Sequence, residues 1–202
     1  MIFRPILVLL VAGLTGGCAA LGSINEASVE LDAYTLSPLG LADSTPRNLH
    51  LVVQLPTSAG ALATDRILIK PSALQAQYLA NGRWTDPAPV LVQTLLLASL
   101  QNQGGFSLVD RDGSGLMPDF TLTTELQEFQ AEPATGAAVT VRVSAAMTLI
   151  REDDLSIVAT RRFSASAMAQ TDGTADLVVA FDVALREVMA DIVSWTRAQT
   201  GG

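Results

Sequence analysis

The chain has 202 residues, which is enough for one domain with a hydrophobic core. Hydrophobic residues make up 49% of the chain and charged residues 16%, a balance that excludes an intrinsically disordered protein. The 20 acidic residues outnumber the 12 lysines and arginines and give a net charge of −8, which excludes a typical nucleic-acid-binding protein because phosphate contacts need clustered positive charge.

The first 17 residues have the pattern of a signal peptide. Arg4 supplies one positive charge, the segment Ile6–Leu14 is apolar, and three small residues follow at positions 15–17. This order is typical of a secretory signal. The apolar segment is shorter than the roughly 20 residues that a membrane-spanning helix needs. We therefore expect residues 1–17 to be removed on export.

Cys18, the only cysteine, directly follows these small residues. One interpretation is an ordinary signal peptide followed by a chance cysteine, and the other is a lipobox with an acylated cysteine. Residues 14–18, Leu-Thr-Gly-Gly-Cys, resemble a lipobox, although Leu14 lies one place further from the cysteine than in the usual pattern. We predict lipidation of Cys18, because a lone cysteine at this place is hard to attribute to chance. Its acyl chains would form a membrane anchor, since each buried methylene contributes ~0.8 kcal/mol.

Residues 18–28 are expected to form a lipidated tether, and residues 29–202 a single domain. Removal of Arg4 leaves 11 basic and 20 acidic side chains, a charge of −9. Ala19 follows the cysteine, and the absence of an Asp there favours the outer membrane by the sorting rule of enteric bacteria. We expect a lipid-anchored protein on the periplasmic face of the outer membrane of a Gram-negative bacterium.

The first half of the domain contains short segments rich in β-forming residues. Strands are predicted at Val29–Leu36, Leu49–Leu55 and Arg66–Lys70, with Leu74–Leu79 as a hairpin partner of the third. Asp86 is the predicted N-cap of a buried helix that carries the apolar run Val90–Leu100 and ends at Gly104-Gly105, and a strand follows at Phe106–Val109.

The second half alternates apolar and polar residues and then changes to a helical period. Asp119–Ala131, Val139–Arg151 and Ser156–Gln170 predict an antiparallel meander with one wet face. Apolar residues from Leu177 to Trp195 recur at helical spacing; Thr174 is the predicted cap, and Asp182 and Arg186 are predicted to pair. The order of elements predicts an α+β fold: an antiparallel β-sheet with two helices packed on one face, in a single domain.

Few residues suggest catalysis or metal binding. His50, the only histidine, is expected to face solvent from a strand. The run Asp110–Gly115 resembles the start of a calcium loop, but Thr121 occupies the place of the bidentate Glu, so we interpret the run as a turn. Glu125 and Glu128 lie at odd spacing on a strand and should face opposite ways. We therefore expect no enzymatic activity, no cofactor and no metal site.

Two segments resemble a known family. The first is Tyr34-Thr35-Leu36-Ser37-Pro38. The second comprises Asp65–Pro71 and the run Tyr-Leu-Ala-Asn-Gly-Arg-Trp-Thr-Asp-Pro at residues 78–87. With these motifs the chain resembles the ABC-type transport auxiliary lipoproteins, most strongly over residues 30–110, with the same order of elements over the whole mature chain.

The resemblance implies partners that composition alone does not indicate. Such lipoproteins work beside ABC permeases that carry mammalian-cell-entry (MCE) domain proteins. These systems move lipids between the inner and outer membranes. It implies an adaptor or tether without hydrolytic activity, held to the membrane by its lipid anchor, and self-association into homo-oligomers is left open. The candidate partner-binding residues are Tyr34, Leu36, Asn81, Arg83 and Trp84.

Each candidate has an alternative interpretation. Asn81-Gly82 is a typical turn dipeptide, and Arg83 and Trp84 at its exit belong to the residue types enriched at interface hot spots. Alternatively, Trp84 packs under the following helix and Arg83 pairs with a carboxylate such as Asp86. A lipid-binding carrier is the second functional hypothesis, and it requires an apolar cavity of several hundred Å³.

Overall fold

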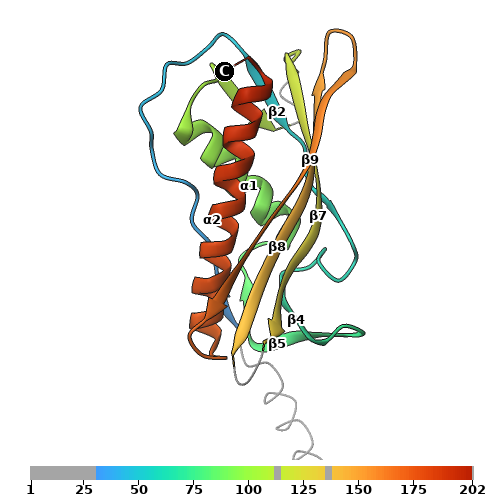
Figure 1. Cartoon of the computed structure of the whole chain (residues 1–202), viewed down its shortest axis with the longest axis vertical. Coiled ribbons are helices and arrows are strands. Elements are labelled where there is room, and N and C mark those ends of the chain that lie inside the picture. Colours follow the sequence, from blue (N-terminus) through green and yellow to red (C-terminus); the bar gives the residue numbers. More distant parts are fainter. Residues whose placement is uncertain (1–30, 112–114, 135–137, 202) are drawn as a thin grey trace, which may run out of the picture. The chain divides into compact units, whose positions relative to one another are not determined.

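The computed structural model describes residues 31–111, 115–134 and 138–201 of the chain. Short strands occupy its first half, and three long strands followed by a long helix occupy its second half (Figure 1). The elements are, in chain order, β1 (Asp32–Tyr34), β2 (His50–Val53), β3 (Thr57–Ser58), β4 (Arg66–Ser72), β5 (Gln75–Trp84), α1 (Ala88–Gln103), β6 (Leu108–Arg111), β7 (Phe120–Pro133), β8 (Val139–Arg151), β9 (Ser156–Ala169) and α2 (Thr174–Gln199).

Strand β7 organises the sheet, because other strands pair along both of its edges. On one edge, β2 pairs with the beginning of β7, β3 with its middle and β4 with its end, all in parallel. On the other edge, β8 pairs antiparallel along the whole length of β7, and β9 pairs antiparallel with β8. The predicted meander of three long strands is confirmed.

The prediction of an antiparallel sheet is wrong for the first half of the chain, where the sheet is mixed. Besides the parallel pairings with β7, β1 runs parallel to β5 and β2 runs parallel to β6, while β4 and β5 form the predicted antiparallel hairpin. Long connections, including residues 35–49 and the segment that contains α1, let the chain return in the same direction. The α+β class is confirmed. The parallel pairings were not predicted because the sequence of a short strand does not indicate whether it runs parallel or antiparallel to its neighbour.

Both helices lie on one side of the sheet (Figure 1). Helix α2 packs on β8 and β9, and α1 packs on α2 and β6. The predicted caps are wrong: Pro87 and Gly173 occupy the cap positions, without a side-chain hydrogen bond, in place of Asp86 and Thr174. The extent of burial in α1 is as predicted, since the buried residues lie around much of its circumference.

Three aromatic side chains join β5, β7 and α2 in the core. The ring centroids of Trp84 and Phe181 lie 5.1 Å apart in an edge-to-face contact, and Phe129 lies 5.4 Å from Trp84 and 4.9 Å from Phe181. All three are fully buried. Burial of each such side chain contributes about 1.5–3 kcal/mol, so this aromatic cluster is a main support of the fold.

The connection of residues 35–49 is held against the ends of both helices by side chains. Arg47 donates hydrogen bonds to the carbonyl oxygens of Gly105 at 3.2 Å and of Thr200 at 3.0 Å. Asn102 donates to the Leu39 carbonyl oxygen at 2.7 Å. The bond to Thr200, and one from the Ser44 hydroxyl to the Gln103 carbonyl oxygen at 2.8 Å, satisfy backbone carbonyls that the end of a helix leaves without a partner.

Asp182 also serves this connection. Its carboxylate accepts a hydrogen bond from the Ser37 amide at 2.7 Å. The predicted ion pair with Arg186 is not formed; the ion pairs among the described residues are Arg83–Asp65 and Arg142–Glu132. The described residues from Asp32 onward form one compact unit.

Candidate functional site

Pairing of β1 with β5 brings together the two segments on which the family resemblance rests. Ala33 lies opposite Arg83, and Tyr34 lies opposite Trp84, in parallel register. The Thr85 amide continues this pairing with a 2.9 Å hydrogen bond to the Tyr34 carbonyl oxygen. Segments separated by more than 40 residues of sequence therefore lie side by side at the β1 edge of the sheet.

Asn81 and Gly82 do not form the predicted turn, because β5 continues through them to Trp84. A Cβ atom on Gly82 would lie 2.8 Å from Cγ2 of Thr174 and 3.2 Å from the ring of Tyr34. The glycine is needed because the start of α2 and the Tyr34 ring lie directly against the strand backbone. Close packing thus explains the glycine of this motif better than turn chemistry does.

Two of the predicted partner-binding residues are parts of the core. Trp84 is 0% exposed within the aromatic cluster, and Leu36 is 6% exposed. Both side chains pack inside the folded domain, and their role as contact residues stays a prediction. The alternative of a packed Trp84 is correct, although its aromatic partners come from β7 and α2.

The other three predicted residues reach the surface. Asn81 is exposed, and Tyr34 and Arg83 are half-buried. Arg83 pairs with Asp65, not with Asp86, at 3.5 Å between Nη1 and Oδ2. Such a partly exposed pair contributes little stability, so its guanidinium can be redirected to a partner at small cost. In this register Tyr34 lies on the same face as Gly82 and Trp84, toward α2, whereas Arg83 lies on the other face. Asn81 and Arg83 are named the β1–β5 surface below.

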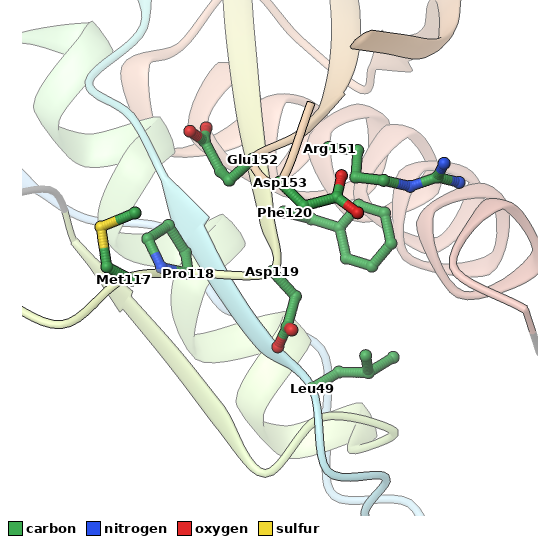
Figure 2. A pocket seen from close by; sticks show the side chains of 8 residues that line it. All are labelled: Leu49, Met117, Pro118, Asp119, Phe120, Arg151, Glu152 and Asp153. Carbon is green, nitrogen blue, oxygen red and sulfur yellow. The ribbon is translucent and has the colours of Figure 1, made fainter. Parts of the chain in front are cut away.

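A hollow lies at the opposite end of the sheet, where β7 begins beside the end of β8 (Figure 2). Its volume is about 420 Å³. Its lining comes from the residue before β2, from the β6–β7 connection with the start of β7, and from the end of β8 with the turn that follows. The residues are Leu49, Met117, Pro118, Asp119, Phe120, Arg151, Glu152 and Asp153. These segments read as connections in the sequence, so no site was predicted from them.

Hydrogen bonds of Asp119 shape this hollow. Its carboxylate accepts a 2.7 Å bond from the His50 amide, and its carbonyl oxygen accepts one from the Glu152 amide at 3.0 Å. Figure 2 shows the Arg151 side chain pointing away from Glu152. Asp119 therefore connects the start of β2 with the end of β8, and these hydrogen bonds give the residue a structural role.

His50 does not face solvent as predicted. Its residue is half-buried, and its Nε2 atom is buried without a hydrogen-bond partner in the described part of the chain. The Asp119 carboxylate accepts its hydrogen bond from the His50 backbone amide and not from the imidazole. The pair therefore lacks the carboxylate–imidazole hydrogen bond of a catalytic base.

Glu125 and Glu128 share one face of the sheet, contrary to the prediction. A bulge between Leu126 and Glu128 adds one residue and shifts the alternation of β7. Both carboxylates border a second hollow, of about 430 Å³, together with Arg162 of β9. The bulge is not visible in the apolar–polar pattern, which predicted an unbroken strand.

Several sequence predictions concern residues outside the described ranges, namely the signal peptide, Cys18 and the middle of the Asp110–Gly115 run. Over the described residues, no cluster of three or more His, Cys, Asp and Glu side chains has the geometry of a metal site. Within the same ranges, no helix combines the length and the apolar character that crossing a membrane requires.

Comparisons with known proteins identify the family. Residues 34–193 match the family described as ABC-type transport auxiliary lipoprotein component. An uncharacterized protein of Bradyrhizobium diazoefficiens, bll6063, is 27% identical over 175 residues, which cover 87% of this chain and 46% of that protein. The chain thus spans about half the length of this curated relative.

Solved structures share the fold. Protein XCC0632 from Xanthomonas campestris, of family DUF330, superposes with a TM-score of 0.76 at 22% identity and covers 85% of this chain and 96% of its own. The hypothetical protein CT253 from Chlamydia trachomatis has a TM-score of 0.54 at 9% identity, over 77% of this chain and 99% of its own. The matched family comprises transport components and is not an enzyme family. With a match over most of its length, the chain belongs to the family of ABC-type transport auxiliary lipoprotein components.

Proposed function

We propose that the protein is a lipid-anchored periplasmic subunit of an ABC/MCE-type intermembrane lipid transport system, and that it acts as an adaptor or tether at the outer membrane. The observation that carries this proposal is the family match over residues 34–193. In this proposal, acylated Cys18 holds the protein at the membrane, and the folded domain binds the MCE-domain protein or the ABC permease complex.

An adaptor fits the structure better than the alternative of a lipid carrier. A carrier needs an apolar cavity between the sheet and the helices, but Trp84, Phe129 and Phe181 fill the centre of that space. The hollow of Figure 2 is large enough for part of a ligand, yet half of its lining residues are charged. Acyl chains bound there would desolvate these charges at considerable cost.

The β1–β5 surface is the proposed docking site. It presents the exposed amide of Asn81 and the half-buried guanidinium of Arg83, and arginine is one of the residue types that dominate protein interfaces. β1 is the first strand of the domain that follows the proposed tether in the sequence.

Association of the two proteins can be measured directly. The protein from residue 24 onward, which lacks the anchor, is mixed with the periplasmic region of the MCE-domain protein of the same bacterium, and the Kd is determined at several salt concentrations. We expect binding, and at least about tenfold weaker binding for Arg83→Glu, the size of effect typical of an interface anchor. Arg142→Glu is the matched control, because Arg142 is also a surface arginine in an ion pair.

Two results would contradict the proposal in different ways. If Arg83→Glu and Arg142→Glu bind equally well, docking occurs elsewhere on the domain. If the proteins do not associate and the domain is purified with stoichiometric lipid, the carrier function replaces the adaptor function. The melting temperature of each variant shows whether a loss of binding reflects unfolding.

A further inference from the structure

The hairpin of β4 and β5 extends beyond the strands that pair with it (Figure 1). β7 pairs with β4 only at Leu68 and Ile69, and β1 pairs with β5 only from Gly82 onward. Every residue from Ser72 to Tyr78 is exposed. Leu74 at the turn is 100% exposed, more than any other large hydrophobic side chain of the described residues. The domain thus presents one apolar side chain on a protruding turn.

The hairpin also lacks acidic side chains, although the protein as a whole is acidic. Of the 20 acidic residues none lies within residues 66–85, whereas this range holds three basic residues, among them Lys70, the only lysine. Lys70 borders a hollow of about 230 Å³ beside the turn, together with Glu132 of β7. Glu132 is paired with Arg142 at 3.0 Å, and Lys70 forms no ion pair within the described part of the chain. Its ammonium group can therefore bind an anion from outside the domain.

An apolar tip beside a lysine is complementary to the surface of an anionic bilayer. Leucine is favourable in hydrocarbon, and lysine near the surface is attracted to lipid phosphates. A protein interface would need more, because a stable one buries about 800 Å² per partner around large anchors. The aromatic residue of the hairpin is not such an anchor, since the Tyr78 hydroxyl donates a 3.3 Å hydrogen bond to the Ala61 carbonyl oxygen.

The proposed lipid anchor keeps the membrane within reach of the turn. Asp32, the first residue of β1, follows Cys18 by 14 positions, which span at most about 50 Å when extended. Asp32 lies opposite Gly82, and the eight positions of β5 and the turn from there to Leu74 span about 26 Å. The tether is therefore long enough for the turn to touch the membrane that holds Cys18.

We propose that the β4–β5 hairpin is a second membrane contact, in which Leu74 enters the boundary between headgroups and acyl chains and Lys70 binds a lipid phosphate. The proposal rests on the lipid anchor of the proposed function, which supplies the attachment. The hairpin then needs to add only a weak contact, because the anchor keeps its local concentration at the membrane high. Two contacts, unlike one, fix the orientation of the domain on the membrane.

A fluorophore beside Leu74 in the full-length protein tests this contact. An environment-sensitive maleimide dye is attached to Ala73→Cys, an exposed position of the turn, while acylation leaves Cys18 without a free thiol. In vesicles of phosphatidylcholine and phosphatidylglycerol, we expect blue-shifted emission that is quenched by lipids with a spin label in the acyl chain. Asp153→Cys is the matched control, because it is exposed in the β8–β9 turn at the opposite end of β7. Its dye should emit as in water.

Variants separate the contributions of the two side chains. Leu74→Asp in the labelled protein should reduce the quenching at least about threefold, because a charged side chain is costly in hydrocarbon. Leu155→Asp places the same charge on the exposed leucine of the β8–β9 turn and should leave the quenching unchanged. Lys70→Gln should reduce the quenching in anionic vesicles and have no effect in vesicles of phosphatidylcholine alone. The melting temperature of each variant shows that the domain is folded.

Failure of the hairpin contact and failure of the anchor give different results. Protein that floats with the vesicles while the dye at residue 73 emits as in water overturns the hairpin contact and leaves the anchor intact. A membrane signal at residue 73 in protein whose Cys18 carries no acyl chain by mass spectrometry supports the hairpin contact and contradicts the anchor. A shielded dye in native membranes but not in vesicles would overturn the hairpin contact, because a protein would then cover the turn.

Discussion

Replacement of Phe181 by alanine is the sharpest test of the core that we describe. Phe181 is 0% exposed, and its ring lies 4.9 Å from that of Phe129 and 5.1 Å from that of Trp84. Truncation of a buried phenylalanine costs about 3–5 kcal/mol, and each aromatic contact adds about 0.5–1.5 kcal/mol beyond the buried area. We expect a loss of roughly 4 kcal/mol in the free energy of unfolding.

The loss can be measured by urea unfolding of the protein from residue 24 onward, followed by circular dichroism. For a domain of this size, 1 kcal/mol corresponds to about 2–4 °C, so Tm should fall by roughly 6–20 °C. Val183→Ala on the same helix is the control, because Val183 is 54% exposed and a surface change is expected to stay within about 0.5 kcal/mol. A loss below about 1 kcal/mol for Phe181→Ala would refute the assignment of the aromatic cluster as the centre of the core.

Four further predictions follow from the sequence and the structure. Gly82→Ala should destabilise the domain by about 1–3 kcal/mol in urea unfolding, because its Cβ would meet Cγ2 of Thr174 at 2.8 Å; Thr174→Ser removes that methyl group and should recover part of the loss. Cys18→Ala should give an unprocessed or soluble protein, whereas mass spectrometry of the wild type should show acyl chains; an unmodified wild-type N-terminus at another residue would contradict lipidation. The protein from residue 29 onward should fold without a metal, so that a chelator leaves its Tm unchanged; a sharp fall would revive the calcium interpretation of the loop at residues 110–115. The hydroxyl and amide of Ser156 hydrogen-bond to Asp154 and hold the pKa of its carboxyl below the usual range. The β8–β9 turn is therefore most stable above the usual Asp pKa and loosens as the pH falls through the lowered pKa. An NMR titration of Asp154 with a midpoint at or above the usual value would contradict this.

Long elements with a clear period are well predicted by the sequence. The three strands of the meander span 13 or 14 residues each, so their alternation is repeated often enough to predict both strand type and antiparallel order. The apolar residues of α2 define one buried face, on which Phe181 lies. Tertiary packing agrees with local periodicity in these elements, and prediction succeeds for that reason.

The errors lie where non-local contacts decide the structure. Short strands such as β1 and β2 carry no signal for direction, so the parallel pairings were not foreseen. Asn81-Gly82 favours a turn in isolation, but pairing of β5 with β1 and the contact of Gly82 with Thr174 keep the strand extended. The bulge in β7 is similarly invisible in the sequence and reverses the expected orientation of Glu128 relative to Glu125.

The sequence does not show which motif residues reach the surface. Asn81 and Arg83 reach it and Tyr34 is half-buried on the face opposite to Arg83, but sequence could not separate them from Leu36 and Trp84, which the fold buries. Tryptophan is enriched both in cores and at interfaces, so its type alone does not distinguish the two. The hollow around Asp119 was missed because its residues come from three connections that are distant in sequence.

Affinity purification of the full-length protein from its own membranes tests the proposed function most directly. The lipid-anchored protein is isolated in mild detergent, and both the co-purified proteins and the bound lipids are identified by mass spectrometry. The adaptor function predicts an MCE-domain protein and the ABC permease complex at near-stoichiometric amounts, with a marked loss of both in Arg83→Glu. Recovery of the protein without these partners, and with one lipid bound per chain in its folded domain, would contradict it.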